Sequence, residues 1–349
     1  MSRCSRRKLK VGVVGIGYLG KFHVEKYARI PEVKIVGLVD LKLERAKGWA
    51  KGVKAKTFDD HRQLLGTVDA VSVVVPTDQH YRVAKDFLQN GSDVLLEKPI
   101  ASTLGEAEDL IATAKKYGRL LQVGHLERFN PAILAARERV RTPLFIESHR
   151  LTPFRDRGTE VDVVLDLMIH DLDIIHSFVH APVAQIHAVG IPVLTEKVDI
   201  ASVRIQFASG CVANITASRV SLEDQRRIRF FQPDNYLTVD YVAKKVTLYN
   251  RLRRQGDQKP QISLEMVQVK TEDALQLELC SFTQSCLQRT TPQVTGEDGK
   301  NALALALEIN RQIQANMEKI PSIISFYKMR ENLPDASWEK AAEAKKIVS

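Results

Sequence analysis

Residues 9–20 read LKVGVVGIGYLG and join a short apolar run to three glycines in the pattern GxGxxG. The apolar run predicts a strand over 9–14, and the glycines stand where that strand would pass into a helix. In such a turn Gly15 permits a tight bend, Gly17 lets the backbone approach a pyrophosphate, and Gly20 brings helix and strand together. The segment therefore predicts a dinucleotide-binding βαβ unit.

An acidic residue follows the second predicted strand at a spacing that is typical of this motif. The strand over 34–39 runs into Asp40, which lies 20 residues beyond the last glycine. A carboxylate there accepts hydrogen bonds from the adenosine ribose and repels a 2′-phosphate. The pattern predicts NAD rather than NADP as the cofactor, with the turn residues Tyr18 and Leu19 beside it.

The first 130 residues alternate β-branched runs with amphipathic segments, as repeated βαβ units do. We predict helices near 18–29, 42–51, 78–90 and 103–117, and strands over 9–14, 34–39, 70–75, 93–97 and 119–123. The fold class is therefore α/β, and residues 1–130 are expected to form an N-terminal NAD-binding Rossmann domain with a doubly wound parallel sheet.

The pattern changes after a predicted helix near 131–140, and alternating strands then surround one long helix at 162–179. Ser209-Gly210 predicts one hairpin between them. We expect residues 131–317 to form a C-terminal α+β domain with a large open, mostly antiparallel sheet, for substrate binding and oligomerisation. Residues 318–349 are expected to form a C-terminal extension with a short helix around 336–346. The predicted strands and later helices are 144–151, 184–191, 199–207, 211–219, 226–232, 236–242, 245–250, 262–270, 273–289 and 299–317.

Composition and charge narrow the classes of partner. The formal net charge is +9, but five of the positive residues stand among the first ten, which leaves +4 for the rest of the chain. Basic residues are not interleaved with aromatic ones as in proteins that stack bases. The chain is therefore expected to bind anionic small molecules and no nucleic acid.

Apolar runs and cysteines bear on the compartment. The longest nearly unbroken apolar run, 11–20, is about half the length that a bilayer span requires, so no membrane association is expected. The sequence SRRKLK at 5–10 resembles a twin-arginine export signal, but the apolar stretch behind it is the glycine motif itself, without a cleavage site. Four scattered cysteines without CxxC spacing suggest neither zinc nor disulfides. A cytoplasmic protein is expected.

Three further loops follow predicted strands and should line one crevice with the glycine motif, because ligands bind outside the carboxyl ends of open α/β sheets. Lys98 is the most informative, since Pro99 excludes helical geometry before it and points a cation toward the nicotinamide. As alternatives, Thr77 could cap the next helix, and His80 could be an ordinary helix residue. The loop residues expected to contact the cofactor are Pro76, Thr77, His80, Glu97, Lys98 and His125.

The helix expected at 162–179 carries one polar stripe on an otherwise apolar surface. Asp162, Asp166, His170, Asp173 and Ser177 share this stripe at a period of 3.6 residues. Asp166 and His170 lie one turn apart and could pair for general-base chemistry. The alternative is a satisfied polar network at a domain junction. A metal site is not expected, because three ligands on one straight helix seldom surround an ion.

Together these motifs resemble the glucose–fructose oxidoreductase and inositol dehydrogenase family of NAD(P)-dependent sugar oxidoreductases, over roughly residues 8–317. The resemblance implies hydride removal from a sugar carbon, with Lys98, Asp166 and His170 as catalytic residues that also contact substrate. Whether His170 or Lys98 takes the hydroxyl proton stays open. The family resemblance rests on four segments: VGVVGIGYLG (11–20), VVVPTDQHYRVAKDFLQNGSDVLLEKPI (73–100), DLMIHDLDII (166–175) and TGEDGKNALALALEI (295–309).

Two segments are similar to the nucleotide-sugar branch of that family: VGHLERFNPA at 123–132 and LTPFRDRGTEVDVVLDLMIHDLDII at 151–175. This implies a UDP-sugar substrate, with C3 of UDP-N-acetylglucosamine as the expected position of oxidation on a route to 3-amino lipid A precursors. Guanidinium groups match phosphate oxygens in pairs. The expected substrate contacts here are Arg128, Asn130, Arg155 and Arg157.

Several alternatives to this substrate remain. Within enzymes they are an inositol or simple sugar dehydrogenase and a dehydrogenase of UDP-N-acetylglucosaminuronate; outside enzymes, a non-catalytic NAD-binding regulatory protein. In the family the open sheet often builds an oligomer interface, and alternate apolar positions along the predicted strands favour a homodimer or homotetramer here as well.

Overall fold

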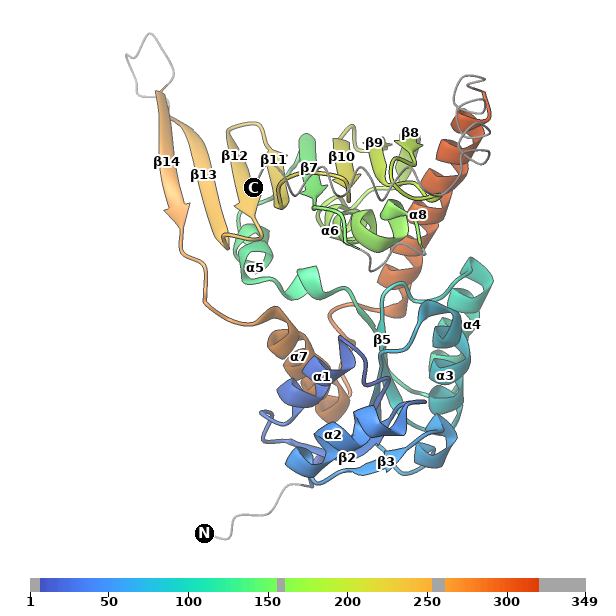
Figure 1. Cartoon of the computed structure of the whole chain (residues 1–349). Coiled ribbons are helices and arrows are strands. Elements are labelled where there is room, and N and C mark those ends of the chain that lie inside the picture. Colours follow the sequence, from blue (N-terminus) through green and yellow to red (C-terminus); the bar gives the residue numbers. More distant parts are fainter. Residues whose placement is uncertain (1–6, 156–160, 253–260, 320–349) are drawn as a thin grey trace, which may run out of the picture.

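The computed structural model describes residues 7–155, 161–252 and 261–319. An N-terminal α/β half and a C-terminal half, built on a second sheet, stack on each other, with β5 and α8 running toward their junction (Figure 1). No helix within the described ranges is long and apolar enough to cross a bilayer. The helix expected around 336–346 lies outside the described residues.

Six parallel strands form the first sheet in the order β3-β2-β1-β4-β5-β6, which is the Rossmann order. The expected doubly wound sheet is confirmed. One strand was not predicted, because β3 has only three residues and too short a pattern to recognise. The strands are β1 (Leu9–Val14), β2 (Val33–Val39), β3 (Lys56–Phe58), β4 (Ala70–Val73), β5 (Asp93–Glu97) and β6 (Leu121–Gly124), and the helices are α1 (Gly20–Tyr27), α2 (Leu43–Val53), α3 (Thr77–Gln89) and α4 (Leu104–Lys116).

Eight strands form the second sheet in the order β14-β13-β12-β11-β7-β10-β9-β8. All neighbours are antiparallel except β7 and β10, which confirms the large, mostly antiparallel sheet. The predicted hairpin at Ser209-Gly210 joins β9 to β10, and Gly210 supplies the positive φ of 86° that it needs. The strands are β7 (Phe145–Leu151), β8 (Val183–Ile191), β9 (Ile200–Phe207), β10 (Val212–Ser218), β11 (Gln225–Phe231), β12 (Asn235–Asp240), β13 (Lys245–Leu252) and β14 (Gln261–Val267).

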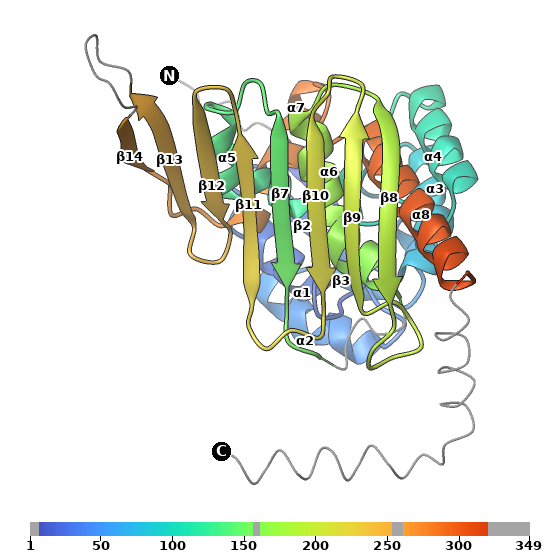
Figure 2. The same cartoon turned by 90° about the horizontal axis from the view of Figure 1, so that it is seen from above.

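Helices cover one face of the second sheet and leave the other open in the described part of the chain. Figure 2 shows the open face toward the viewer, with α5 (Pro131–Arg137), α6 (Ile169–Phe178) and α8 (Gly296–Met317) behind it. Alternate strand residues, such as Val203 and Ile205 of β9, bury their side chains against these helices. The covered face therefore holds the core of this half. Helix α6, which packs on this face, also carries His170 of the site described below.

Helix α7 (Ala274–Gln288) packs on the Rossmann half although it follows the second sheet in sequence. Its Leu279 and Phe282 join the core cluster that contains Val11 of β1, and Lys26 of α1 lies 3.0 Å from Asp273 at the start of α7. In Figure 1 α7 lies beside α1. The range 131–317 is therefore not one packing unit, because the chain returns to complete the first core.

Candidate active site between the two halves

The glycine turn has the geometry that its sequence predicts. Gly15 has φ +92°, and a Cβ on it would lie 2.3 Å from the carbonyl oxygen of Val74. A Cβ on Gly20 would lie 1.7 Å from the carbonyl oxygen of Gly15, whereas Gly17 has nothing within 4 Å of that position. Gly15 and Gly20 thus permit the turn and its close packing. Gly17 leaves the open approach that a pyrophosphate requires.

Asp40 is fixed against this turn. Its carboxylate accepts the backbone N–H of Ile16 at 2.8 Å with one oxygen and that of Lys42 at 2.8 Å with the other. The side chain is buried, and each oxygen keeps a lone pair for a further donor. Asp40 therefore offers an oriented acceptor for ribose hydroxyls. Tyr18 and Leu19 of the turn are exposed beside it.

Pro76 and Thr77 form the junction from β4 into α3, and His80 ties this helix to the turn that carries Lys98. The His80 ring nitrogens lie 2.8 Å from the Pro99 carbonyl oxygen and 2.9 Å from that of Val75. Burial lowers the pKa of His80. The neutral ring has one N–H, which donates to one of these two carbonyls, so His80 links α3 to the turn, while its contact with the cofactor stays a prediction.

Lys98 reaches from the end of β5 to the helix that carries Asp166. Its Nζ donates to the Asp166 carbonyl oxygen at 2.7 Å and lies 3.7 Å from the Asp166 carboxylate. Burial lowers the pKa of Lys98, while the charges of Asp166 and Glu97 act in the opposite direction. The ammonium group is thus held at the junction of the two halves by a contact that bridges them.

Glu97 and His125 lie at the ends of the two neighbouring strands. Glu97 is oriented by His23, whose Nε2 lies 3.1 Å from its carboxylate, and a Cβ on Gly124 would lie 3.0 Å from the same side chain. His125 is buried, and within the described residues neither of its ring nitrogens has a hydrogen-bond partner. Unpartnered buried nitrogens call for a bound polar group. His125 therefore stays a candidate cofactor contact.

His170 presents a neutral imidazole to the site. Its Nδ1 is buried without a hydrogen-bond partner in the described part of the chain. Burial, together with the charges of Lys98 and Arg150, holds the pKa of His170 well below its usual value. An imidazole that is neutral at physiological pH has a free lone pair, and this is what a proton acceptor needs.

The expected pair between Asp166 and His170 does not form. Among the described residues, Asp166 has no hydrogen bond to His170 and contacts Lys98 instead. The reason is local: residues Val164–Met168 form a π turn before α6 begins at Ile169. Residues four apart stack in an α-helix, but a π turn is wider and breaks that register. Asp166 thus serves Lys98, and another group must orient His170.

A buried ion-pair network fixes α6 on the second sheet. Asp171 accepts from Arg150 Nε at 2.6 Å and from the Ser148 hydroxyl at 2.9 Å, and Arg150 also lies 3.0 Å from Glu127. Arg150 and Asp171 are 3% and 1% exposed. Because Asp171 directly follows His170, this network holds the histidine in place. The sequence signal overlooked was a charged residue at an inward position of a predicted strand.

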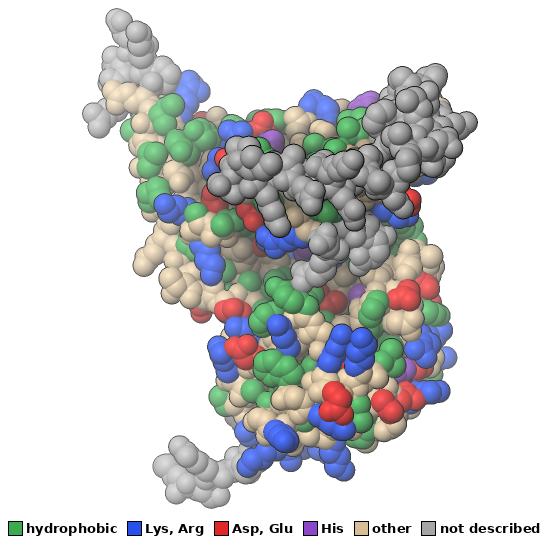
Figure 3. Space-filling view, viewed as in Figure 1, with side chains coloured by type: hydrophobic (Ala, Val, Ile, Leu, Met, Phe, Trp, Pro, Cys, Tyr) green, Lys and Arg blue, Asp and Glu red, His purple; other side chains and the backbone are tan. Residues whose placement is uncertain are grey.

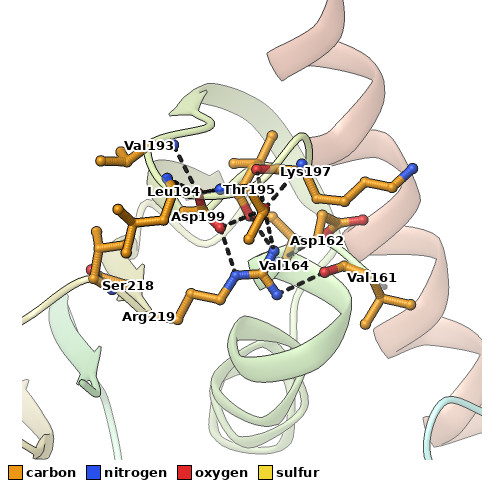
Figure 4. A network of polar contacts seen from close by, with 12 residues as sticks. Val161, Asp162, Val164, Val193, Leu194, Thr195, Lys197, Asp199, Ser218 and Arg219 are labelled. Carbon is orange, nitrogen blue, oxygen red and sulfur yellow. Dashed lines mark hydrogen bonds and ion pairs between the residues drawn. The ribbon is translucent and has the colours of Figure 1, made fainter. Parts of the chain in front are cut away.

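A second network holds the chain just before the π turn (Figure 4). The fully buried Asp199 accepts the backbone N–H groups of residues 193–195 at 2.6–2.8 Å and the Arg219 Nε at 2.8 Å. Arg219 donates in turn to the Val161 carbonyl oxygen at 2.8 Å. Asp162 then caps the first turn through its carboxylate. These contacts define where the site helix begins, and sequence periodicity alone did not identify them.

Arg128 does not point a free guanidinium at the site. It is 5% exposed, donates to Asp173 at 2.6 and 2.8 Å, and lies 3.3 Å from Asp298. These two carboxylates satisfy its charge. The expected diphosphate contact of Arg128 is therefore replaced by a structural one, which joins α6 to the start of α8.

The other expected substrate residues differ in position. Asn130 caps α5 by accepting the Ala132 N–H at 3.0 Å and is buried. Arg155 is exposed and lies 3.3 Å from Asp224. Arg157 lies outside the described residues. The structure thus brings together Lys98, Asp166 and His170, but it commits Arg128 and Asn130 to internal contacts.

Comparison with known proteins agrees with this geometry. A family model for an NAD-binding Rossmann oxidoreductase family matches residues 9–125, and a GFO/IDH/MocA C-terminal domain model matches residues 136–233. The fold and site define an NAD-dependent oxidoreductase that acts on CH–OH groups. More particularly, the chain belongs to the GFO/IDH/MocA family, which confirms the resemblance found in the sequence.

Several relatives illustrate the range of the family. UDP-N-acetylglucosamine 3-dehydrogenase of Acidithiobacillus ferrooxidans is 35% identical over 89% of this chain and 99% of its own. Its solved structure has a TM-score of 0.82 and covers 88% of this chain and 98% of that one. Myo-inositol 2-dehydrogenase of Thermotoga maritima is 25% identical over 88% of this chain and 96% of its own. Scyllo-inositol dehydrogenase of Lactobacillus casei, solved with bound NAD(H), has a TM-score of 0.74 at 20% identity, with 88% of this chain and 98% of that chain covered.

Proposed function

We propose that this enzyme oxidises C3 of UDP-N-acetylglucosamine to a ketone with NAD. The observation that carries the proposal is the 35% identity to a UDP-N-acetylglucosamine 3-dehydrogenase along nearly the whole length of that protein. Lys98 and His170, brought together between the two halves, supply the groups that alcohol oxidation needs. A 3-keto sugar is a substrate for transamination, which fits a role in making 3-amino sugars for lipid A.

Bound NAD supplies the hydride acceptor, and the glycine turn with Asp40 would hold it. In our proposal His170 accepts the hydroxyl proton, because its imidazole is neutral and its Nδ1 is unpartnered within the described residues. Lys98 holds the reacting oxygen and stabilises the developing alkoxide charge, and Asp166 keeps that ammonium group in position. The ion pair between Arg150 and Asp171 holds the part of α6 that carries His170.

The direct test is NADH formation by the purified protein with UDP-N-acetylglucosamine, UDP-glucose, UDP-N-acetylglucosaminuronate, free N-acetylglucosamine and myo-inositol. We expect the highest kcat/KM with UDP-N-acetylglucosamine and a loss of kcat as well as affinity with the free sugar, since remote binding energy positions the reacting carbon. Product analysis should locate the ketone at C3. An equal or higher kcat/KM with inositol or free sugar would refute the assignment.

The pH dependence should separate the two candidate proton acceptors. If His170 accepts the proton, kcat/KM falls in acid as the imidazole is protonated at its lowered pKa, well below the usual 6.5 or so. It falls again in alkali when Lys98 loses its charge, below the usual lysine value of about 10.4. Initial rates between about pH 5 and 10 give the profile. A kcat/KM that rises through the alkaline limb would instead make Lys98 the base.

Cofactor preference should follow from Asp40. We expect NAD to bind at least about tenfold more tightly than NADP, or about 1.4 kcal/mol, because the carboxylate repels a 2′-phosphate. Asp40→Asn removes the charge but keeps an acceptor for the glycine turn, so it should narrow the difference. Calorimetric titration with both cofactors measures it. Equal affinities in the unaltered protein would show that Lys42 or Arg45 overrides Asp40.

We further propose that a second copy of the chain covers the open face of the second sheet. A cross-strand row there runs through Phe145, Phe231, Tyr236, Tyr249 and Leu264, which lie opposite one another in register. The ring centroids are 5.4 Å apart for Phe145 and Phe231, 5.3 Å for Phe231 and Tyr236, and 4.2 Å for Tyr236 and Tyr249. Hydrophobic side chains also gather over β13 and β14 (Figure 3). An exposed row of aromatic and aliphatic side chains of this kind favours a homodimer or homotetramer.

Leu264→Arg should separate the copies without unfolding the chain. Leu264 is 58% exposed, so an arginine costs little in the free subunit but buries a charge in the assembly. Light scattering should give two or four times the 39.2 kDa chain mass for the unaltered protein and the chain mass for the variant. Leu41→Arg, at a 92% exposed site of the Rossmann half, is the control. A monomeric unaltered protein would contradict the proposal.

The compartment is also a proposal. Cys211, Cys280 and Cys286 are free thiols, and free thiols persist where the environment is reducing. We therefore place the enzyme in the cytoplasm. Fractionation of cells that express the full chain tests this placement.

A further inference from the structure

Arg226 of β11 lies on the helix-covered face of the second sheet, at the edge of the site. It stands directly opposite Arg150 of β7, and its carbonyl oxygen accepts the N–H of Tyr241. Further along the same strand Ile228 and Phe230, at alternate positions, are buried in the core. Strand alternation therefore puts Arg226 on the inner face, in line with Arg150.

The two neighbouring arginines differ in how their charge is balanced. Arg150 faces two carboxylates, Asp171 at 2.6 Å and Glu127 at 3.0 Å. The Arg226 guanidinium, in contrast, has no hydrogen bond or ion pair within the part of the chain that the structure describes. It is half-buried, beside another cation, without a carboxylate of its own. A partly desolvated cation without a partner gains stabilisation when an anion binds to it.

The outward-facing arginines of the same strand behave differently. Arg227 lies 3.5 Å from Asp240 and Arg229 lies 2.5 Å from Glu147, so each has an acidic partner. Within the described residues, Arg226 thus differs from the other two arginines of β11, which face outward and each have a carboxylate partner.

The position of Arg226 relative to the reacting groups follows from the ion-pair network. Arg150, its cross-strand neighbour, binds Asp171, and Asp171 directly follows His170 in α6. Arg226 is also among the charges that lower the pKa of His170, after burial and the charges of Lys98, Arg150 and His125. The guanidinium of Arg226 therefore lies close enough to His170 for its charge to affect the imidazole.

We infer that Arg226 binds the diphosphate of the nucleotide-sugar substrate, an inference that rests on the proposed function. A guanidinium donates two parallel hydrogen bonds to phosphate oxygens, which suits a diphosphate. Arg128 is held by Asp173 and Asp298, and Arg155 is exposed beside Asp224, so neither offers a free inner-face cation. Arg226 would anchor the remote part of the substrate and leave the sugar carbon to Lys98 and His170.

The experiment compares Arg226→Met with Arg227→Met, a matched change at the next residue of the same strand but on the opposite face. For Arg226→Met we expect KM for UDP-N-acetylglucosamine and the Kd of UDP, measured by calorimetry, to rise at least about tenfold. The Kd of NAD should change less than about twofold. Arg226→Lys should restore part of the affinity, since it keeps the charge but not the paired donors. Arg227→Met should resemble the unaltered enzyme.

The outcomes separate this inference from the function on which it rests. If the unaltered enzyme oxidises UDP-N-acetylglucosamine but Arg226→Met leaves KM and the Kd of UDP unchanged, the inference is overturned and the function stands. If UDP-N-acetylglucosamine is not oxidised while UDP still binds and loses affinity in Arg226→Met, the diphosphate site stands and the function fails. Circular dichroism checks folding, and Arg226→Gln replaces the methionine variant if that variant does not fold.

Discussion

Replacing Lys98 by methionine is expected to lower kcat by about 10²-fold or more, which corresponds to at least about 2.7 kcal/mol of lost transition-state stabilisation. Methionine keeps most of the length of the side chain but removes the ammonium group that the Asp166 carbonyl oxygen holds at 2.7 Å. In our proposal that charge acts on the reacting oxygen as alkoxide character develops, so the loss falls on kcat. Steady-state rates of NADH formation measure the effect.

The same variant should keep most of its affinity for NAD, because in our proposal the glycine turn and Asp40 hold the cofactor. Fluorescence titration of the cofactor provides that control. Lys47→Met is the matched surface change, since Lys47 pairs with Glu44 on an exposed part of α2 and should have no effect on rate. A Lys98→Met variant with near-normal kcat would remove Lys98 from the chemistry.

Replacing Asp171 by alanine is expected to lower the free energy of unfolding by about 3–5 kcal/mol. The change removes a buried partner from Arg150 and from the Ser148 hydroxyl, and it leaves a desolvated guanidinium with Glu127 alone. Urea titration followed by circular dichroism measures the loss. Because Asp171 adjoins His170, kcat should fall in the same variant under conditions where it remains folded.

Glu44→Ala is the matched control for this prediction. Glu44 pairs with Lys47 at 2.7 Å on the exposed surface of α2, where a pair contributes about 0–1 kcal/mol. Equal losses in the two variants would mean that burial gives the Arg150–Asp171 pair no special weight.

The Rossmann half could be predicted from sequence because its determinants are local. Gly15 and Gly20 meet steric demands within one turn, Gly17 leaves that turn open to a pyrophosphate, and Asp40 stands at a spacing set by one βαβ unit. The placement of α7 could not be predicted in the same way. An apolar helical face shows that a helix packs, but it does not tell which of two cores it joins.

The sequence predicted which residues of the candidate site come together better than it predicted the contacts between them. A period of 3.6 residues placed Asp166 over His170, and the π turn at 164–168 separated them. Arg128 sits beside a motif that suggested phosphate binding, yet its partners Asp173 and Asp298 are distant in sequence and close only in the fold. Inward charges such as Arg150 gain their meaning only once the facing helix is in place.

The return of α7 to the first core has a consequence for how the chain is made. A ribosome that has released residues 1–130 has produced six strands but not the helix that covers Val11 and its neighbours. At about 5–20 residues per second, residues 131–288, to the end of α7, take roughly 8–32 s to be made. During that time the nascent Rossmann half exposes the apolar surface that α7 later covers, so we expect it to depend on chaperones. For the same reason we expect a recombinant fragment that ends at residue 130 to aggregate.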